Sequence, residues 1–226
     1  MKKLLLFFIF SSKLMQGQEI TVDFLNSMDS NIYSQIIASS HGDLDNDKVD
    51  ELLLVVNRLA STLDNIPRNI ILLKKKEGSW VKWQESSTEI LGSGEGGVMG
   101  DPFEDAYIED NEIHISHSGG SRWRWSYHHT YSFRKNLFLL KSYYSYWGAL
   151  CESKTEIIFN LISGVGYYYV DVEECPEGFG DNSYMKESLP LKEDFFRTEL
   201  HIDLFSRTDS IYTITTPLNN IFTLPR

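Results

Sequence analysis

Residues 122–134 read RWRWSYHHTYSFR, and the alternation of side chains in this stretch decides the class of fold that the sequence predicts. Its odd positions, from Trp123 to Phe133, carry aromatic rings and one histidine, whereas its even positions carry arginine, serine, threonine and histidine. Successive side chains of a strand point to opposite faces of the sheet, so one face of this segment is aromatic and the other is polar. The stretch therefore predicts a half-buried antiparallel strand.

Strand-like segments on both sides of this stretch extend the β prediction to most of the chain. Residues 51–57 (ELLLVVN) form a short continuous apolar run, which is typical of a strand buried on both faces. Turn residues separate the other strand-like segments, as in hairpins. These segments are 69–75, 79–84, 112–117, 137–147, 155–161, 165–172 and a last one around 210–215. We expect a mainly β fold on the borderline of α+β, namely an antiparallel β-sandwich or curved sheet of about nine strands.

One helix is predicted before the strands. Apolar residues between positions 22 and 39 recur at a spacing close to the 3.6 residues of a helical turn. They are Phe24, Leu25, Met28, Ile32, Ile36 and Ile37. This spacing predicts a single amphipathic helix over residues 22–39.

The amino-terminal 17 residues have the order of a secretory signal. Lys2 and Lys3 precede an apolar run over residues 4–10, and a polar stretch then leads to Gly17, after which we expect cleavage. The apolar run is far shorter than the ~20 residues that span a bilayer. We therefore expect an exported protein, periplasmic or extracellular, with one β-rich domain over residues 18–226 and no transmembrane segment after signal removal.

The charge of the chain limits its partners. The 21 basic and 32 acidic residues give a formal charge of −11, and removal of residues 1–17 with their three lysines would make it −14. A surface of this sign repels a phosphate backbone. Nucleic acid is therefore excluded as an expected partner, which leaves a glycan, a peptide or a protein.

Two cysteines flank the expected hairpin of residues 155–172. A turn at Ser163 and Gly164 pairs positions whose numbers sum to about 327, and Cys151 and Cys175 sum to 326, so the two would lie opposite each other. An exported protein meets an oxidising compartment, so we predict a disulfide between them. Two unpaired core thiols are the alternative. No thiol-activating motif surrounds either residue to favour a catalytic cysteine.

An acidic loop, GDLDNDKVDE at residues 42–51, leads into the apolar strand of residues 51–57. Alternating carboxylates in a tight loop can converge on Ca²⁺, which prefers several oxygen ligands. The expected ligands are Asp43, Asp45, Asp47, the carbonyl of Val49 and Glu51, with Asp50 as an alternative to Glu51. An EF-hand is excluded, because its twelfth position needs a bidentate glutamate and is Leu54 here. The competing interpretation is a solvated acidic turn capped by its own Asx hydrogen bonds.

This loop resembles the Asp-rich cation loop of FG-GAP and VCBS-type repeats, in which a similar run precedes a strand. The resemblance covers about 15 residues, and a single copy cannot build a propeller, because such repeats work in arrays. The sequence departs from the pattern at Lys48, where glycine usually permits the turn. Residues 96–140, with GGVMGDPFE and ISHSGGSRWRWSY, look like a family of uncharacterised secreted bacterial proteins that carry a GDLDxD-type loop. This second resemblance implies an exported β domain and no particular activity.

Four of the six histidines lie close together in the sequence, at His114, His117, His128 and His129. On a strand, His114 and His117 point to opposite faces and cannot chelate one ion together. A turn centred near Gly120 would place His114 near Ser126 and His117 near Trp123, with His114 and His128 as diagonal neighbours. We expect polar-face or core histidines here, with a transition-metal site as the alternative.

Two interpretations of function remain. The first is a non-catalytic, Ca²⁺-stabilised module that binds a glycan, a peptide or a cell-surface component through exposed aromatic residues and the arginines Arg122, Arg124 and Arg134. The alternative for these arginines is pairing with the protein's own carboxylates. The second interpretation is an extracellular, glycan-directed hydrolase that acts through Asp101 and Glu104 as a carboxylate pair, or through a histidine. We favour the binding module, because the sequence does not show an acid and a base positioned for catalysis.

Overall fold

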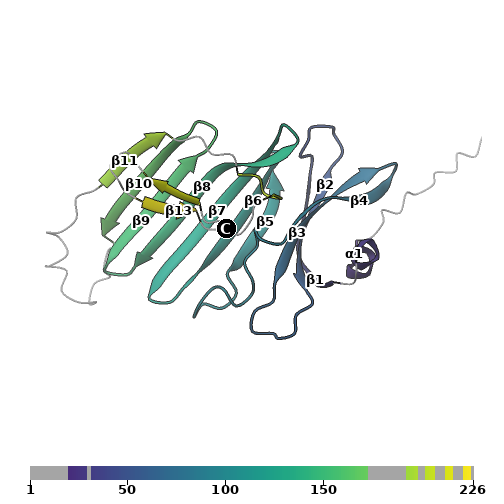
Figure 1. Ribbon diagram of the computed structural model, residues 1–226, viewed down its shortest axis with the longest axis horizontal. Coiled ribbons are helices and arrows are strands. Elements are labelled where there is room, and N and C mark those ends of the chain that lie inside the picture. Colours follow the sequence, from purple (N-terminus) through teal and green to yellow (C-terminus); the bar gives the residue numbers. More distant parts are fainter. Residues whose placement is uncertain are drawn as a thin grey trace, which may run out of the picture.

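The computed structural model describes residues 20–29, 32–172, 192–197, 202–206, 212–215 and 221–224, and the described part of the chain is a mainly β protein. It contains two larger antiparallel sheets, one two-stranded sheet and one helix (Figure 1). The predicted antiparallel β class with a single helix is confirmed. Thirteen strands replace the expected nine or so.

The small sheet has four strands in sequence order, and the large sheet has seven. The small sheet consists of β1 (Tyr33–Gly42), β2 (Glu51–Arg58), β3 (Arg68–Lys76) and β4 (Ser79–Ser86). In order across the large sheet are β11 (Lys192–Arg197), β10 (Val165–Val172), β9 (Ser153–Asn160), β8 (Leu137–Ala149), β7 (Trp123–Arg134), β6 (Glu112–Gly120) and β5 (Phe103–Glu109). The strands β12 (Tyr212–Thr215) and β13 (Ile221–Leu224) form the third sheet.

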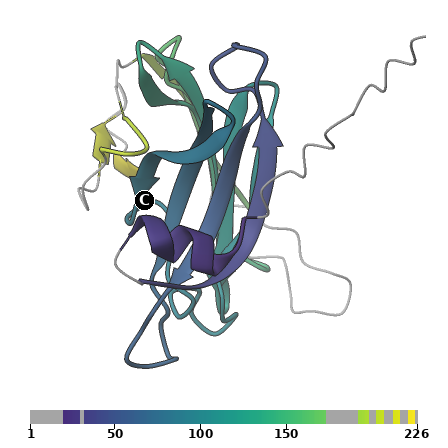
Figure 2. The same ribbon diagram turned by 90° about the vertical axis from the view of Figure 1, so that its right-hand side faces the viewer.

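The small sheet is buried on both of its faces, as the apolar run of residues 51–57 predicts. One face packs in the main core against the large sheet, where Leu53 and Leu72 join Ile115 and Tyr131. The other face packs in a second core that includes Leu25 of the helix α1 (Val22–Met28). The helix lies in front of the small sheet in Figure 2, and the large sheet lies behind it. The protein is thus layered as helix, small sheet and large sheet.

The alternation along β7 is confirmed at its odd positions. Tyr131 is fully buried in the main core, and Tyr127 and Phe133 pack against that core. At the even positions, Arg124 and Arg134 are exposed, whereas Thr130 and Ser132 are buried, so the polar face meets solvent only in part. The carboxyl-terminal segment covers another part of the same inner face, because Leu140 donates its N–H to the Ile202 carbonyl at 2.8 Å and Leu204 belongs to the core.

The expected helix over residues 22–39 is wrong in its length. The helix ends at Met28, and β1 begins at Tyr33, so the apolar residues Ile36 and Ile37 lie on a strand. A side chain–backbone pair marks the corner, where Asn26 donates to the Tyr33 carbonyl and accepts from the Tyr33 N–H, both at 3.0 Å. Packing in the second core therefore overrides the helical spacing, because Tyr33 is buried there beside Leu25.

The expected turn at Gly119, Gly120 and Ser121 is also shifted. Both glycines belong to β6, and Gly120 pairs with Arg124. His114 is consequently opposite Thr130 rather than Ser126, and His117 is opposite Tyr127 rather than Trp123. Gly119 is needed inside the strand, because a Cβ there would lie 2.4 Å from Cζ2 of Trp125. The close approach of an indole ring, and not a turn, accounts for this glycine.

The hairpin of β9 and β10 is confirmed, with Val165 opposite Asn160. Cys175 lies outside the described residues, and the disulfide with Cys151 stays a prediction. Residues 1–17 also lie outside them, so the signal peptide is an expectation. In the part that the structure describes, no helix combines the length and the apolar character that crossing a bilayer requires.

The burial of Leu25 predicts how strongly the helix layer stabilises the fold. Leu25 is 1% exposed, so Leu25→Ala leaves a cavity under the small sheet and should lower the free energy of unfolding by about 2 to 4 kcal/mol in urea denaturation. Leu59→Ala is the control, because Leu59 is 62% exposed and should change the free energy by less than about 0.5 kcal/mol. Equal effects of the two substitutions would contradict the layered arrangement.

Candidate functional site

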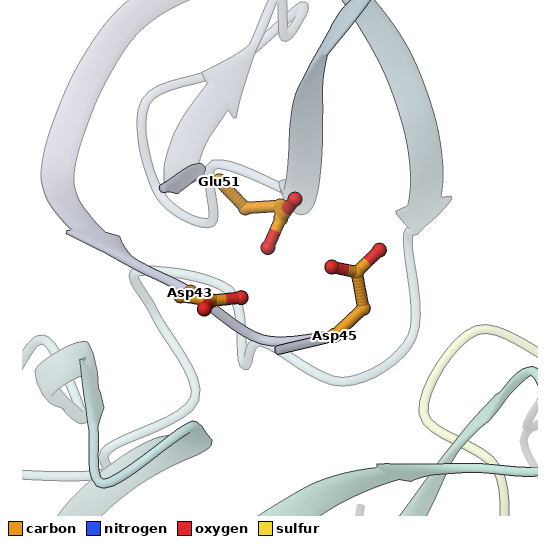
Figure 3. A group of neighbouring side chains, drawn as sticks. All are labelled: Asp43, Asp45 and Glu51. Carbon is orange, nitrogen blue, oxygen red and sulfur yellow. The ribbon is translucent and has the colours of Figure 1, made fainter. Parts of the chain in front are cut away.

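The acidic loop joins β1 to β2 and brings three of the predicted ligands together. Carboxylate oxygens of Asp43, Asp45 and Glu51 all lie within 4.8 Å of one another. Figure 3 shows the three side chains pointing toward a common space, with Asp43 directly after β1 and Glu51 at the start of β2. Among the described residues, this is the only group of three or more histidine, cysteine or acidic side chains with such spacing.

Glu51 is the most unusual member of this group, because its side chain is completely buried. Its Oε2 accepts the Leu44 N–H at 2.8 Å, while its Oε1 has no hydrogen-bond partner. Burial raises the pKa of the Glu51 carboxyl above its ordinary value. A buried carboxylate oxygen without a partner is costly. This oxygen is therefore the carboxylate atom of the loop whose burial is least compensated by hydrogen bonds.

The loop also forms the Asx hydrogen bonds of the competing interpretation. The Asp43 carboxylate accepts the N–H groups of Asp47 at 3.1 Å and of Lys48 at 2.9 Å. The Asp47 carboxylate accepts the Val49 N–H at 2.8 Å. Asp47 and Val49 are thus part of the turn and do not belong to the group of three carboxylates. These bonds shape the loop and leave Glu51 Oε1 without a donor.

Lys48, the position that departs from the FG-GAP pattern, has the positive φ that glycine adopts most easily. Lys48 has a φ of 70°, and Asn46 has a φ of 63°. The left-handed region is disfavoured for a lysine, though asparagine tolerates it. The loop therefore adopts a glycine-like turn at Lys48 in spite of its side chain, and the hydrogen bond from the Lys48 N–H to Asp43 fixes it there.

A lysine that the sequence analysis missed reaches the carboxylate group from β3. The Lys74 ammonium contacts Asp45 directly and lies 3.5 Å from Asp47 Oδ2 and 3.9 Å from Glu51 Oε1. Its hydrogen bond to Asp45 is the largest cause of a raised Lys74 pKa. No sequence pattern links Lys74 to the loop, because the pairing of β2 with β3 alone brings the two segments together.

The structure brings together two of the three predicted arginines. Arg122 and Arg124 line a hollow of about 390 Å³ at one end of β7 and β8, where the Arg122 guanidinium contacts Glu152. Arg134 lies at the other end of β7, roughly 33 Å away at a rise of about 3.3 Å per residue. The three arginines are all exposed, but the length of the strand separates Arg134 from the other two, so one small ligand would not contact all three.

The predicted carboxylate pair of a hydrolase is not arranged for acid catalysis. The buried Arg68 guanidinium binds both oxygens of Asp101, including an Nη1–Oδ1 bond of 2.6 Å, and holds the pKa of Asp101 below its ordinary value. Glu104 accepts a hydrogen bond from the Ser118 hydroxyl. A general acid needs a raised pKa, so the lowered pKa of Asp101 argues against that role for it.

The four histidines form two different groups. His114 Nδ1 lies 3.3 Å from His128 Nε2 on the outer face of the large sheet, as the diagonal pairing predicts. His117 and His129 are both 1% exposed on the inner face. There His129 Nδ1 lies 2.9 Å from the buried Glu89, which also accepts the Tyr131 hydroxyl. Glu89 lies in the loop after β4, where no periodicity signals its burial.

Comparison with protein-family models, with curated proteins and with solved structures finds no match to this chain. The two resemblances drawn from the sequence are therefore neither supported nor contradicted. Function has to be argued from the side chains of the protein itself.

The burial of His117 predicts a pH dependence of stability. Burial, followed by the nearby His129, lowers its pKa to about 3 from 6.5. Below about pH 6.5 the unfolded chain takes up a proton that the folded protein refuses, so stability falls as the pH falls toward 3, by up to ~1.4 kcal/mol per pH unit.

Urea denaturation at about pH 7 and about pH 4.5 measures this effect. His117→Gln should lose less stability between the two pH values than the parent does. His41→Gln, at an exposed histidine, should behave as the parent. The same loss in all three proteins would show that His117 does not contribute to the pH dependence.

Proposed function

We propose that the protein is an exported, non-catalytic binding module, stabilised by Ca²⁺, that recognises an acidic glycan or peptide of a cell surface. The observation that carries the recognition is the hollow lined by Arg122 and Arg124 in a chain of formal charge −11. The ligand-binding hollow and the cation site consist of different residues, so separate experiments test them.

The hollow has the features of a small anion site. Arg124 is exposed and makes no ion pair with any described residue, so its guanidinium is available to a carboxylate. Gly148 pairs with Arg124 across the sheet and leaves room, since a Cβ there would lie 2.6 Å from the Tyr146 hydroxyl. Tyr146 and Leu150 supply aromatic and apolar surface at the same place. Such a site suits a ligand that carries both a carboxylate and a hydrophobic face.

The cation part rests on Glu51. Its partnerless Oε1 and the carboxylates of Asp43 and Asp45 offer three hard oxygen ligands within a small space. Ca²⁺ prefers such oxygens, completes its shell with carbonyls and water, and would offset the cost of the buried charge. The metal would then have a structural role, because it would fix the turn between β1 and β2.

The signal-like order of residues 1–17 supports the export part of the proposal, and a Ca²⁺ site is consistent with it. Millimolar Ca²⁺ outside the cell suits the weaker class of calcium sites. An exported protein would also allow the disulfide between Cys151 and Cys175. The ligand is then a component of the periplasm or of a surface outside the cell.

Thermal melts test the cation part. Millimolar CaCl₂ should raise the melting temperature relative to chelator, by about 2 to 4 °C for each kcal/mol of binding energy. Asp45→Ala should remove most of this difference, because it deletes one of the three converging carboxylates. Asp50→Ala is the control, because this exposed acid of the same loop stands outside the group. Identical parent melts in calcium and chelator, with no heat of binding in calorimetry, would remove the metal from the proposal.

A binding measurement tests the recognition part. Polygalacturonate and a poly-glutamate peptide serve as acidic probes, and neutral dextran serves as the uncharged one. Arg124→Ala should weaken binding of an acidic probe about tenfold or more while the melt is nearly unchanged, since exposed charges contribute little to stability. Arg134→Ala is the matched control at the far end of β7 and should bind as the parent does. Equal binding by the two variants, or no preference for acidic probes, would refute the site.

A further inference from the structure

Beyond its contacts with Asp45 and Asp47, the Lys74 ammonium faces Glu51 Oε1, which among the described residues is the one buried carboxylate oxygen that lacks a hydrogen bond. It lies 3.9 Å from Glu51 Oε1, too far for a hydrogen bond and near enough for charge attraction. We infer that the Lys74 ammonium is a tethered counter-cation of this loop, and that Ca²⁺ binds there by displacing it. This inference rests on the proposed cation site and adds the competitor that regulates it.

The position of Lys74 on β3 explains why its ammonium is at the loop. The buried part of β3 ends at Leu73, and Lys74 is the first residue beyond it. Leu73 lies opposite Leu52 of β2, which follows Glu51 directly. The pairing of the two strands therefore places a lysine beside the entrance to the carboxylate group.

Three contacts hold the ammonium, and none closes it in. Two are the ion pairs with Asp45 and Asp47, and the third is the Trp83 ring, whose centroid lies 4.9 Å from Lys74 Nζ. The Lys74 side chain is 30% exposed, so it can swing toward solvent when a divalent ion takes its place. Displacement would thus move a charge away from Trp83, which gives the exchange an optical signal.

A single positive charge compensates three carboxylates only in part. Asp43 is satisfied by backbone N–H groups, and Lys74 serves Asp45 first, while Glu51 Oε1 receives only charge attraction at a distance. A divalent ion among the same oxygens would contact all three at once. The ammonium therefore stabilises the metal-free protein and, for the same reason, weakens the binding of Ca²⁺.

Substitution of Lys74 by methionine tests the exchange. Lys74→Met keeps the length and apolar stem of the side chain and removes its charge. Calorimetry with CaCl₂ should show affinity about tenfold or more above that of the parent, since a charge contact of this kind amounts to at least ~1.4 kcal/mol. In chelator, the variant should melt below the parent, because Glu51 and Asp45 lose their compensating charge.

Lys75→Met is the matched control. Lys75 is the next residue of β3 and carries the same charge, but its ammonium lies over the Trp80 ring, 5.0 Å from the centroid, on the side of the second core. It should change the net charge equally and leave the Ca²⁺ affinity as in the parent. Tryptophan fluorescence gives a second readout, because Ca²⁺ should change the emission of the parent more than that of Lys74→Met.

The outcomes separate this inference from the proposed site. Equal Ca²⁺ affinity in the parent, Lys74→Met and Lys75→Met would overturn the competition and leave the cation site in place. Binding by Lys74→Met alone would overturn displacement in the native protein, because the lysine would then be the permanent occupant of the site. An absence of binding in all three proteins would overturn the cation site together with the inference.

Discussion

The structure depends on the burial of both faces of the small sheet. Its two central strands, β2 and β3, each carry a continuous run of buried apolar residues, at 52–56 and 70–73, so they need cover on two sides. The large sheet covers one side, and α1 with the adjacent Ile20 and Ile32 covers the other. A sheet of this kind cannot be left half in water, because each exposed leucine or isoleucine would give up about 1.5 to 3 kcal/mol of burial. The layered arrangement is the result.

The same burial creates the chemistry of the acidic loop. Glu51 is the first residue of β2, and the continuous burial of that strand draws its carboxylate out of water along with the leucines that follow. A charge in this position needs compensation. The loop supplies a backbone N–H from Leu44, and β3 supplies the ammonium of Lys74. A second buried carboxylate lies between the sheets, where Glu89 is compensated by contacts with His129 and Tyr131.

The sequence predicts those parts of the structure that depend on side-chain period and local motif. The alternation of residue types at 122–134 and the apolar run at 51–57 identify β7 and β2, although burial along β7 is continuous from residue 129 to residue 132 and does not alternate there. The failures share one cause, which is contact between distant segments. Ile36 and Ile37 fit a helical period, yet pairing of β1 with β2 makes them strand residues.

The candidate site divides in the same way. Asp43, Asp45 and Glu51 could be predicted, because a local motif places them on one loop. Lys74 and Glu89 could not, since only the pairing of strands and the closing of the core bring them near their partners. The arginines show the opposite error, because a shared strand face says nothing of the distance between Arg124 and Arg134 along β7.

The negative charge of the acidic loop is therefore compensated in two ways, and each of them is incomplete. Backbone N–H groups donate hydrogen bonds to the carboxylates of Asp43 and Asp47. The turn that allows this places the backbone of Lys48 in the left-handed region. The Lys74 ammonium compensates Asp45 and reaches Glu51 only by charge attraction. Neither the backbone N–H groups nor the Lys74 ammonium donates a hydrogen bond to Glu51 Oε1. A loop that needed only to be soluble could carry a neutral glutamine at position 51. A divalent ion at this turn would offset the cost of the buried carboxylate, and its binding would then be coupled directly to the folding of the turn.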